Sequence, residues 1–265
     1  MGTTSKALTL LDYFDRAHAV IGLSDLARMS GINKATCFRL MSELVEHGLA
    51  EQMSESREYR IGPAVLRLAA LREAAVPLRD LAMPILHRLA QTTAETAHMS
   101  HLVGGKLAIL GYAYSAAHAM KVMMEDAEVL PLHATSSGYT VLAYLPPAVA
   151  EAILAQPLAA VTKATLICPD DLRARLAEVR RLGYARTANT YEADVASLAL
   201  PLFDARGTCT GAIAVAAPQT RLTPAAAILT LSALIDAARA AMAAWGSQIP
   251  PDLDAQWRRT QEATS

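Results

Sequence analysis

The chain has little cysteine and few aromatic residues, and both shortages exclude classes of protein. Its 265 residues include three cysteines that are far apart and form no C-x-x-C pair. No disulfide framework is therefore expected, which fits a reducing cytoplasm. Aromatic residues make up 5%, charged residues 18% and hydrophobic residues 53%, so the chain is neither an aromatic-rich stacking protein nor a disordered polymer. Its length is enough for two modest domains with cores of their own.

Excess charge of either sign and a charge-free hydrophobic run are also missing. The net charge is −1, which argues against a protein coated in basic charge without excluding a local basic face. The polar start of the chain shows no secretory signal. The most apolar stretch, Ala225 to Trp245, is interrupted by Asp236 and Arg239, a pair that a membrane span would rarely carry. We therefore expect a packed, alanine-rich helix there and a cytoplasmic protein.

The first sixty residues have the helix signals of a small separate domain. Hydrophobic spacing predicts a helix near residues 4–17. Ser24 is expected to cap a short second helix that Gly31 ends, and Asn33 to cap a third helix that Gly48 ends. Two short strands, near 49–53 and 58–61, would follow as a hairpin. This order predicts a winged helix-turn-helix over residues 1–62, followed by a linker helix over 63–76.

The rest of the chain alternates helices and strands, which predicts an α+β second domain with an antiparallel sheet. Gly104-Gly105 is a strong hairpin signal. We expect this domain over residues 77–247, and a loose polar tail over 248–265. The expected strands lie near 95–103, 107–114, 120–125, 196–203 and 211–216, and the expected helices near 78–92, from Ser136 to before Pro146, over 169–182 and from Pro224.

The third N-terminal helix has the features of a DNA recognition helix, which meets base edges with its first turns. Lys34 and Arg39 can reach phosphates or guanine, and Thr36 can contact a phosphate or a thymine methyl group. Phe38, with Met41 and Val45, is expected to face inward. The candidate DNA contacts, including two arginines in the wing, are Ser24, Asn33, Lys34, Ala35, Thr36, Arg39, Arg57 and Arg60.

The charge of this lobe is an objection to that interpretation. From Met1 to Gly62 there are two lysines and five arginines against three aspartates and five glutamates, whereas DNA-binding domains are usually more basic. A small helical cap domain is the alternative. If the lobe binds DNA, so few cations require a dimer or tetramer that reads several half-sites, and a modest dependence on salt.

An ordered set of segments resembles the IclR family of bacterial transcriptional regulators. The segments are Ser5-Lys6-Ala7-Leu8, Leu23-Ser24-Asp25-Leu26-Ala27, Thr36-Cys37-Phe38-Arg39-Leu40, His47-Gly48-Leu49, Tyr59-Arg60-Ile61-Gly62, Leu130-Pro131-Leu132-His133-Ala134-Thr135-Ser136-Ser137-Gly138, Gly183-Tyr184-Ala185 and Ala199-Leu200-Pro201-Leu202-Phe203-Asp204. The resemblance implies a winged helix-turn-helix, a linker helix and a GAF-like effector domain. It also implies homodimers or homotetramers on operator DNA, and no cofactor.

The resemblance places effector contacts at Ser136, Ser137 and the segment from Thr187 to Ser197. The chain departs from the family pattern at two points. The family usually has Gly-Lys where this chain has Gly138-Tyr139, and often Gly-Val-Arg-Cys where this chain has Asp194-Val195-Ala196-Ser197. The architecture is therefore expected to follow the family, whereas the identity of the effector does not follow from it.

The residues themselves suggest a pocket for a polar-headed ligand. Unsatisfied N–H groups at a helix start, here at Ser136 and Ser137, favour a carboxylate, although Thr135 or Ser136 could simply cap its own helix. In the expected strand over 120–125, alternate residues face opposite sides, so Met120, Val122 and Met124 are expected to point inward. There they would form either pocket lining or ordinary core. The remaining candidate effector contacts are Met120, Val122, Met124, Thr187, Asn189, Val195 and Ser197. We expect a small, partly apolar ligand with an acid, amide or similar head, of which an aromatic acid is one type.

An enzyme is the main competing class, and a protein-binding sensor module with a helical cap domain is a third. His98 and His101 lie three apart on an expected strand, so they point to opposite faces and make a poor zinc pair. Ser137-Gly138 lacks the G-x-S-x-G elbow of serine hydrolases. Glycine-rich phosphate loops are also missing, since Gly104-Gly105 is a hairpin signal. We therefore expect a regulator, repressor or activator, and neither an enzyme nor a metalloprotein.

Overall fold

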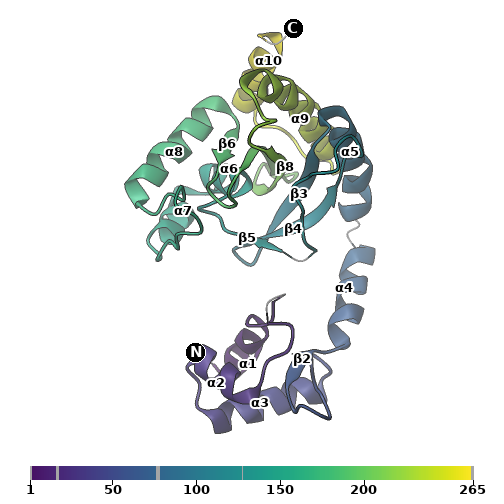
Figure 1. Ribbon diagram of the computed structural model, residues 1–265, viewed down its shortest axis with the longest axis vertical. Helices are drawn as coiled ribbons and strands as arrows, with labels where there is room; N and C mark the ends of the chain where they lie inside the picture. The colour runs from purple at the N-terminus through teal and green to yellow at the C-terminus, as the bar shows by residue number, and fades with distance from the viewer. Residues whose placement is uncertain (1, 16–17, 76–77, 127, 264–265) are drawn as a thin grey trace. The chain divides into compact units, whose positions relative to one another are not determined.

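The computed structural model describes residues 2–15, 18–75, 78–126 and 128–263. The chain divides into two compact units, Met1–Pro77 and Leu78–Ser265. Figure 1 labels most of the helices and strands of both units.

Unit 1 is a helical bundle with a two-stranded hairpin. Its core contains Leu10, Leu26, Leu40 and Tyr59, which are at most 1% exposed. The two strands pair antiparallel, with Glu51 opposite Arg60. The elements are α1 (Thr3–Leu11), α2 (Leu23–Ser30), α3 (Lys34–Glu46), β1 (Ala50–Gln52), β2 (Tyr59–Ile61) and α4 (Ala64–Ala75).

The helix boundaries of unit 1 confirm one predicted cap and correct another. The Asn33 side chain accepts a hydrogen bond from the Thr36 N–H at 2.9 Å, as predicted for the start of α3. Ser24 is not a cap, because α2 begins at Leu23, two residues before the predicted start at Asp25, and Gly22 precedes the helix in an extended conformation. The Gly22 carbonyl accepts from the N–H groups of Asp25 and Leu26. The first helix, predicted near 4–17, ends at Leu11, and residues 16–17 lie outside the described residues.

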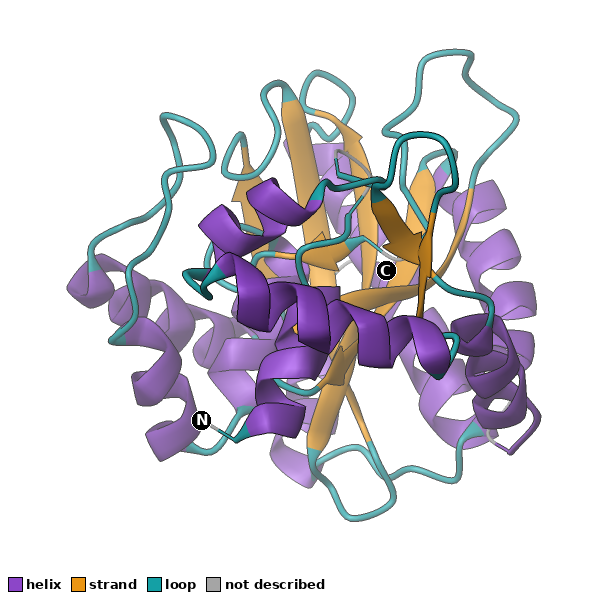
Figure 2. Ribbon diagram, turned by 90° about the horizontal axis from the view of Figure 1, so that it is seen from below, coloured by secondary structure: helices purple, strands orange, loops and turns teal. Residues whose placement is uncertain are grey.

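Unit 2 contains a six-stranded antiparallel sheet in the order β5-β4-β3-β8-β7-β6. Helices α5 and α9 pack together and contact its strands, whereas α6 contacts β6, β7 and β8 and packs against α8. Figure 2 shows helices on both sides of the strands. The strands are β3 (Thr96–Val103), β4 (Lys106–Ala113), β5 (Val129–Leu130), β6 (Ala185–Ala188), β7 (Val195–Phe203) and β8 (Cys209–Pro218); the helices are α5 (Leu78–Thr93), α6 (Ser136–Tyr144), α7 (Pro147–Leu154), α8 (Pro169–Leu182), α9 (Pro224–Ala244) and α10 (Pro251–Glu262).

Most of the predicted elements of unit 2 are present. Gly104 and Gly105 both adopt positive φ angles, 57° and 78°, as a tight hairpin between β3 and β4 requires. The sequence analysis did not predict α7 and β6, and it also missed β5 and α10. In the part of the chain that the structure describes, α9 is the one helix long and apolar enough to cross a membrane. It contacts β7 and β8 of the sheet, as expected for a packed helix.

The predicted strand over 120–125 is wrong. This segment has no regular structure, and Val129–Leu130 pairs with β4 instead. In this segment, side chains bind carbonyl groups that would bond to a neighbouring strand if the segment belonged to a sheet. Thr96 Oγ1 donates to the Val122 carbonyl at 2.8 Å, and Arg221 Nη2 donates to the Met120 carbonyl at 3.0 Å. The alternation of apolar residues therefore did not reflect a pleated strand.

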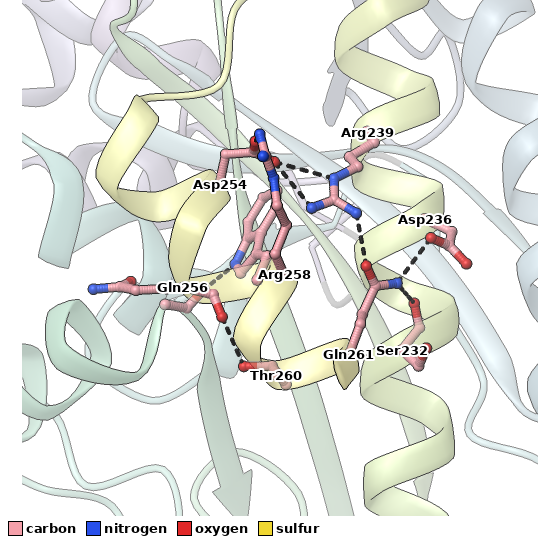
Figure 3. A network of polar contacts seen from close by, with 10 residues as sticks. Ser232, Asp236, Arg239, Asp254, Gln256, Arg258, Thr260 and Gln261 are labelled. Carbon is pink, nitrogen blue, oxygen red and sulfur yellow. Dashed lines mark hydrogen bonds and ion pairs between the residues drawn. The ribbon is translucent and has the colours of Figure 1, made fainter. Parts of the chain in front are cut away.

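The predicted loose tail over 248–265 is also wrong, because it contains α10. Trp257 is fully buried and its indole N–H donates to the Gly183 carbonyl at 2.8 Å. Arg239 of α9 pairs with Asp254 of α10 at 2.9 Å, and Gln261 reaches Asp236 (Figure 3). Trp257 and Leu253 lie four residues apart, so they share one helix face that the polar composition of the tail concealed.

Candidate nucleic-acid interface and ligand pocket

The buried stripe of α3 determines which of its side chains face solvent. Cys37, Leu40, Met41 and Leu44 are buried at the spacing of one helix face. Burial raises the pKa of the Cys37 thiol, so this cysteine is a core residue rather than a nucleophile. Phe38 was expected to face inward, but it lies beside the stripe and is 50% exposed.

The predicted DNA contacts are exposed or half-buried residues of unit 1. Thr36 is half-buried, and the others are exposed: Ser24, Asn33, Lys34, Ala35, Arg39, Arg57 and Arg60. Lys34 Nζ donates to the Ser24 hydroxyl at 2.9 Å, which joins the first residue of α3 to α2. Within the described residues, no acidic side chain pairs with Arg39. Arg60 pairs with Glu51 at 3.0 Å and holds the pKa of that carboxyl below its usual range, so the charge of Arg60 is partly offset.

Unit 2 contains a small cavity of about 70 Å³, less than the roughly 300–1,000 Å³ that is usual for small-molecule sites. Its floor follows from the sheet register. Thr187 of β6 lies opposite Ser197 of β7, which lies opposite Ala216 of β8, so these side chains share a face. Seven of the nine predicted effector contacts line this cavity: Val122, Met124, Ser136, Ser137, Thr187, Val195 and Ser197.

The N-terminus of α6 lies at the cavity. Thr135 caps the helix, since its hydroxyl accepts from the Gly138 N–H at 3.0 Å. Ser136 and Ser137 precede Gly138 in the first turn of α6, so their N–H groups have no acceptor within the helix. A Cβ on Gly138 would lie 2.3 Å from the Leu132 carbonyl oxygen, so only glycine permits this close approach. Capping and pocket lining, which the sequence left as alternatives, therefore occur together.

Two serine hydroxyls link α6 to the sheet. Ser136 Oγ lies 2.7 Å from Ser197 Oγ, and Ser137 Oγ lies 3.3 Å from His98 Nε2. His98 is 5% exposed, and this burial lowers its pKa to about 4, so the ring is neutral at physiological pH. Among the described residues, His98 Nδ1 has no hydrogen-bond partner. The sequence analysis weighed this histidine only as a metal ligand, and no group of three or more metal-binding side chains is present in the described residues.

Several lining residues come from loops and were not predicted. Tyr191 donates its hydroxyl hydrogen to Glu128 Oε1 at 2.6 Å. Burial, together with this bond, raises the pKa of Tyr191. Met123, Thr190 and Glu192 also line the cavity, and among its described lining residues there is no lysine or arginine. The sequence offered one signal, the implied effector segment from Thr187 to Ser197, which contains Thr190, Tyr191 and Glu192.

Two predicted effector contacts do not line the cavity. Met120 is 74% exposed, because its segment is not a strand and its alternation does not fix an inward face. Asn189 adopts a positive φ of 61°, and its side-chain oxygen accepts from the Asp194 N–H at 2.8 Å. Its side chain therefore closes the turn between β6 and β7 instead of facing a ligand.

The fold agrees with the comparisons with known proteins. The family model of the bacterial transcriptional regulator IclR C-terminal domain matches residues 72–243, and that of the IclR helix-turn-helix domain matches residues 3–54. The chain belongs to the IclR family. It is therefore a transcriptional regulator with a helix-turn-helix DNA-binding domain and a C-terminal effector-binding domain, as the resemblance implied.

Three relatives illustrate the range of similarity within the IclR family. The transcriptional repressor IclR of Escherichia coli is 27% identical over 83% of this chain and 81% of its own. The crystal structure of an IclR transcriptional regulator from Silicibacter sp. TM1040 has a TM-score of 0.90 and 50% identity, covering 95% of this chain and 99% of that one. An IclR homologue from Microbacterium hydrocarbonoxydans, solved with 4-hydroxybenzoate, has a TM-score of 0.73 and 26% identity, covering 92% and 99%.

Proposed function

We propose that this IclR-family regulator binds operator DNA through residues 1–62 and responds to a small effector in the cavity of unit 2. Residues 63–76 serve as the linker helix, and residues from 78 onward serve for effector binding and self-association. The protein acts by binding rather than catalysis, in the cytoplasm. The single observation that carries this proposal is the cavity at the N-terminus of α6, since it joins the predicted effector residues of distant segments.

The DNA contacts of the proposal are the exposed residues at the leading end of α3 and in the wing. Lys34 and Arg39 reach phosphates or guanine edges, and Thr36 contacts a phosphate or a thymine methyl group. Ser24, Asn33 and Ala35 surround them, and Arg57 and Arg60 contact the minor groove or backbone. Because residues 1–62 contain seven lysines and arginines against eight acidic residues, a homodimer or homotetramer reads several half-sites.

The effector of the proposal carries a carboxylate or amide head at the start of α6. The N–H groups of Ser136 and Ser137 carry partial positive charge, and both hydroxyls line the same cavity. With no lysine or arginine among the described lining residues, backbone and hydroxyl donors have to bind the head. The Microbacterium relative was solved with 4-hydroxybenzoate, which supports an aromatic acid as one type of effector.

The proposed mechanism couples the two sites through self-association. Effector binding rearranges the loops around the cavity and thereby changes how second domains associate, which alters the spacing of the recognition helices. The effector must prefer one arrangement by about 1–3 kcal/mol, which corresponds to about a 5- to 150-fold change in operator affinity.

A gel-shift titration on DNA flanking the protein's own gene tests this function. We expect a shifted fragment whose midpoint changes at least about fivefold with one member of a panel of small acids and amides. S137A is expected to shift the fragment normally and to lose most of the response. S232A, a serine of the same unit outside this cavity, is the matched control. Failure to retain any genomic fragment at low salt would overturn the regulator assignment.

A further inference from the structure

One wall of the effector cavity is acidic. It is formed by Glu128, Tyr191 and Glu192, which we call the acidic wall. Glu128 is half-buried and accepts the Tyr191 hydroxyl hydrogen at 2.6 Å. Its other carboxylate oxygen lies 3.4 Å from the Glu125 N–H, a long contact that leaves accepting capacity unused. In the described lining, no lysine or arginine offsets these charges.

A second observation, independent of the acidic wall, indicates that the cavity accepts a ligand. His98 lines the same cavity, is 5% exposed, and leaves its Nδ1 atom without a partner among the described residues. A buried polar atom without a partner costs stability, so a polar group that reaches Nδ1 from the cavity would be stabilising.

The charges therefore differ between the two polar parts of the cavity. The start of α6 provides N–H groups and hydroxyls for an acid head, as the proposed function states. At the acidic wall, a second anionic group of the ligand would be repelled, whereas a hydrogen-bond donor would gain a charge-assisted bond. An ammonium group would gain more than a hydroxyl group, because it also offsets the uncompensated carboxylates.

We infer that the effector ends, at the acidic wall, in a hydrogen-bond donor, so that it is an amino-carboxylate or hydroxy-carboxylate and not a diacid. This inference rests on the proposed acid head at α6. It assigns Glu128 as the residue that selects the far end of the ligand and Tyr191 as the residue that positions Glu128.

Two matched ligand series test this inference by isothermal titration calorimetry on the full chain. The aliphatic series is 4-aminobutyrate, 4-hydroxybutyrate, butyrate and succinate; the aromatic series is 4-(aminomethyl)benzoate, 4-hydroxybenzoate, 4-methylbenzoate and terephthalate. Each series keeps the acid head and changes only the far end. In whichever series fits the cavity, we expect affinity to fall in the order given, with at least about a tenfold difference between the ammonium and the diacid.

The variant E128Q separates charge selection from general binding. It is expected to bind the diacid at least about threefold better and the ammonium compound at least about threefold worse than the unmodified protein. E178Q on α8, outside the cavity, is the charge-matched control. Y191F provides a second variant and is expected to reduce the same preference while retaining the fold, which thermal unfolding checks.

Each outcome decides between the two proposals. Equal binding across a series, or a preference for the diacid, overturns the inference about the acidic wall and leaves the acid head at α6 intact. A preference that E128Q and Y191F both leave unchanged also overturns it. Failure of all eight compounds to bind overturns the acid head, and the inference with it.

Discussion

Arg221 pairs with Glu95 and also binds the segment over residues 120–124, which supplies Val122 and Met124 to the effector cavity. Breaking this ion pair therefore tests stability and ligand binding together. Arg221 Nε and Nη2 donate to the two Glu95 carboxylate oxygens at 2.5 and 2.7 Å. Nη2 also donates to the Met120 carbonyl at 3.0 Å. The Glu95 side chain is 7% exposed and that of Arg221 is 26% exposed. The variant R221M therefore leaves a nearly buried carboxylate without its cation.

The magnitude follows from this unequal exposure. Removing one partner of a fully buried pair costs about 3–5 kcal/mol, and partial access of water reduces this, so we expect R221M to lower the free energy of unfolding by about 2–3 kcal/mol. E95Q leaves the more exposed partner unpaired and is expected to cost about 1 kcal/mol. The double variant E95Q/R221M removes the stranded charge and is expected to be more stable than R221M alone.

Urea unfolding of the full chain measures these differences, and effector titration measures the effect on the cavity. Loss of the bond to the Met120 carbonyl loosens the segment that supplies Val122 and Met124, and one hydrogen bond of about 1 kcal/mol corresponds to about a fivefold weaker effector affinity. Equal destabilisation by R221M and E95Q, or a double variant less stable than R221M, would refute this account of the pair.

Two further predictions concern α10 and His98. W257A is expected to lower the free energy of unfolding by about 3–5 kcal/mol, because Trp257 is fully buried. W257F loses the bond to the Gly183 carbonyl and part of the ring volume, so it is expected to cost about 1 kcal/mol for the bond in addition to the cost of the cavity left by the smaller ring. Equal and negligible effects of the two variants in urea unfolding would show that α10 is not part of the folded unit. Burial holds the pKa of His98 at about 4, below its usual value of about 6.5, so the unfolded chain takes up this proton first and stability is lost as the pH falls from about 6.5 to about 4. The stability advantage of the unmodified protein over H98Q should shrink by up to about 3 kcal/mol across that window, and an advantage that does not change with pH would contradict the buried neutral ring.

The parts of the fold that sequence patterns predicted are those specified by local chemistry. The cap at Asn33, the αL residue Gly48 and the Gly104-Gly105 turn each depend on a conformation that few other residues adopt. The segment over 120–125 failed for the opposite reason. Its backbone is held by the side chains of Thr96 and Arg221, which come from distant positions and leave no local pattern.

The polar composition of the C-terminal segment led to a wrong prediction, and the pocket residues that lie in loops were harder to predict than those in helices and strands. The tail after Gln248 is polar, yet Leu253 and Trp257 bury one face of α10 against the rest of unit 2. In the cavity, Ser136, Ser137 and Ser197 were predicted from the family resemblance together with their positions at a helix start and on a strand. His98 and Glu128 were not predicted as pocket residues, since their contribution depends on tertiary contacts with Ser137 and Tyr191.

The measurement that tests the central claim most directly is the affinity of the full chain and of R39A for the DNA flanking its own gene, by fluorescence anisotropy at several salt concentrations. R206A, which removes an exposed arginine from a hairpin turn of unit 2, is the charge-matched control. We predict that R39A weakens binding by about 5- to 150-fold, an effect of about 1–3 kcal/mol, while R206A binds like the unmodified protein and R39A retains its fold and effector binding. Equal operator affinity of R39A and the unmodified protein would contradict recognition of DNA by the leading end of α3.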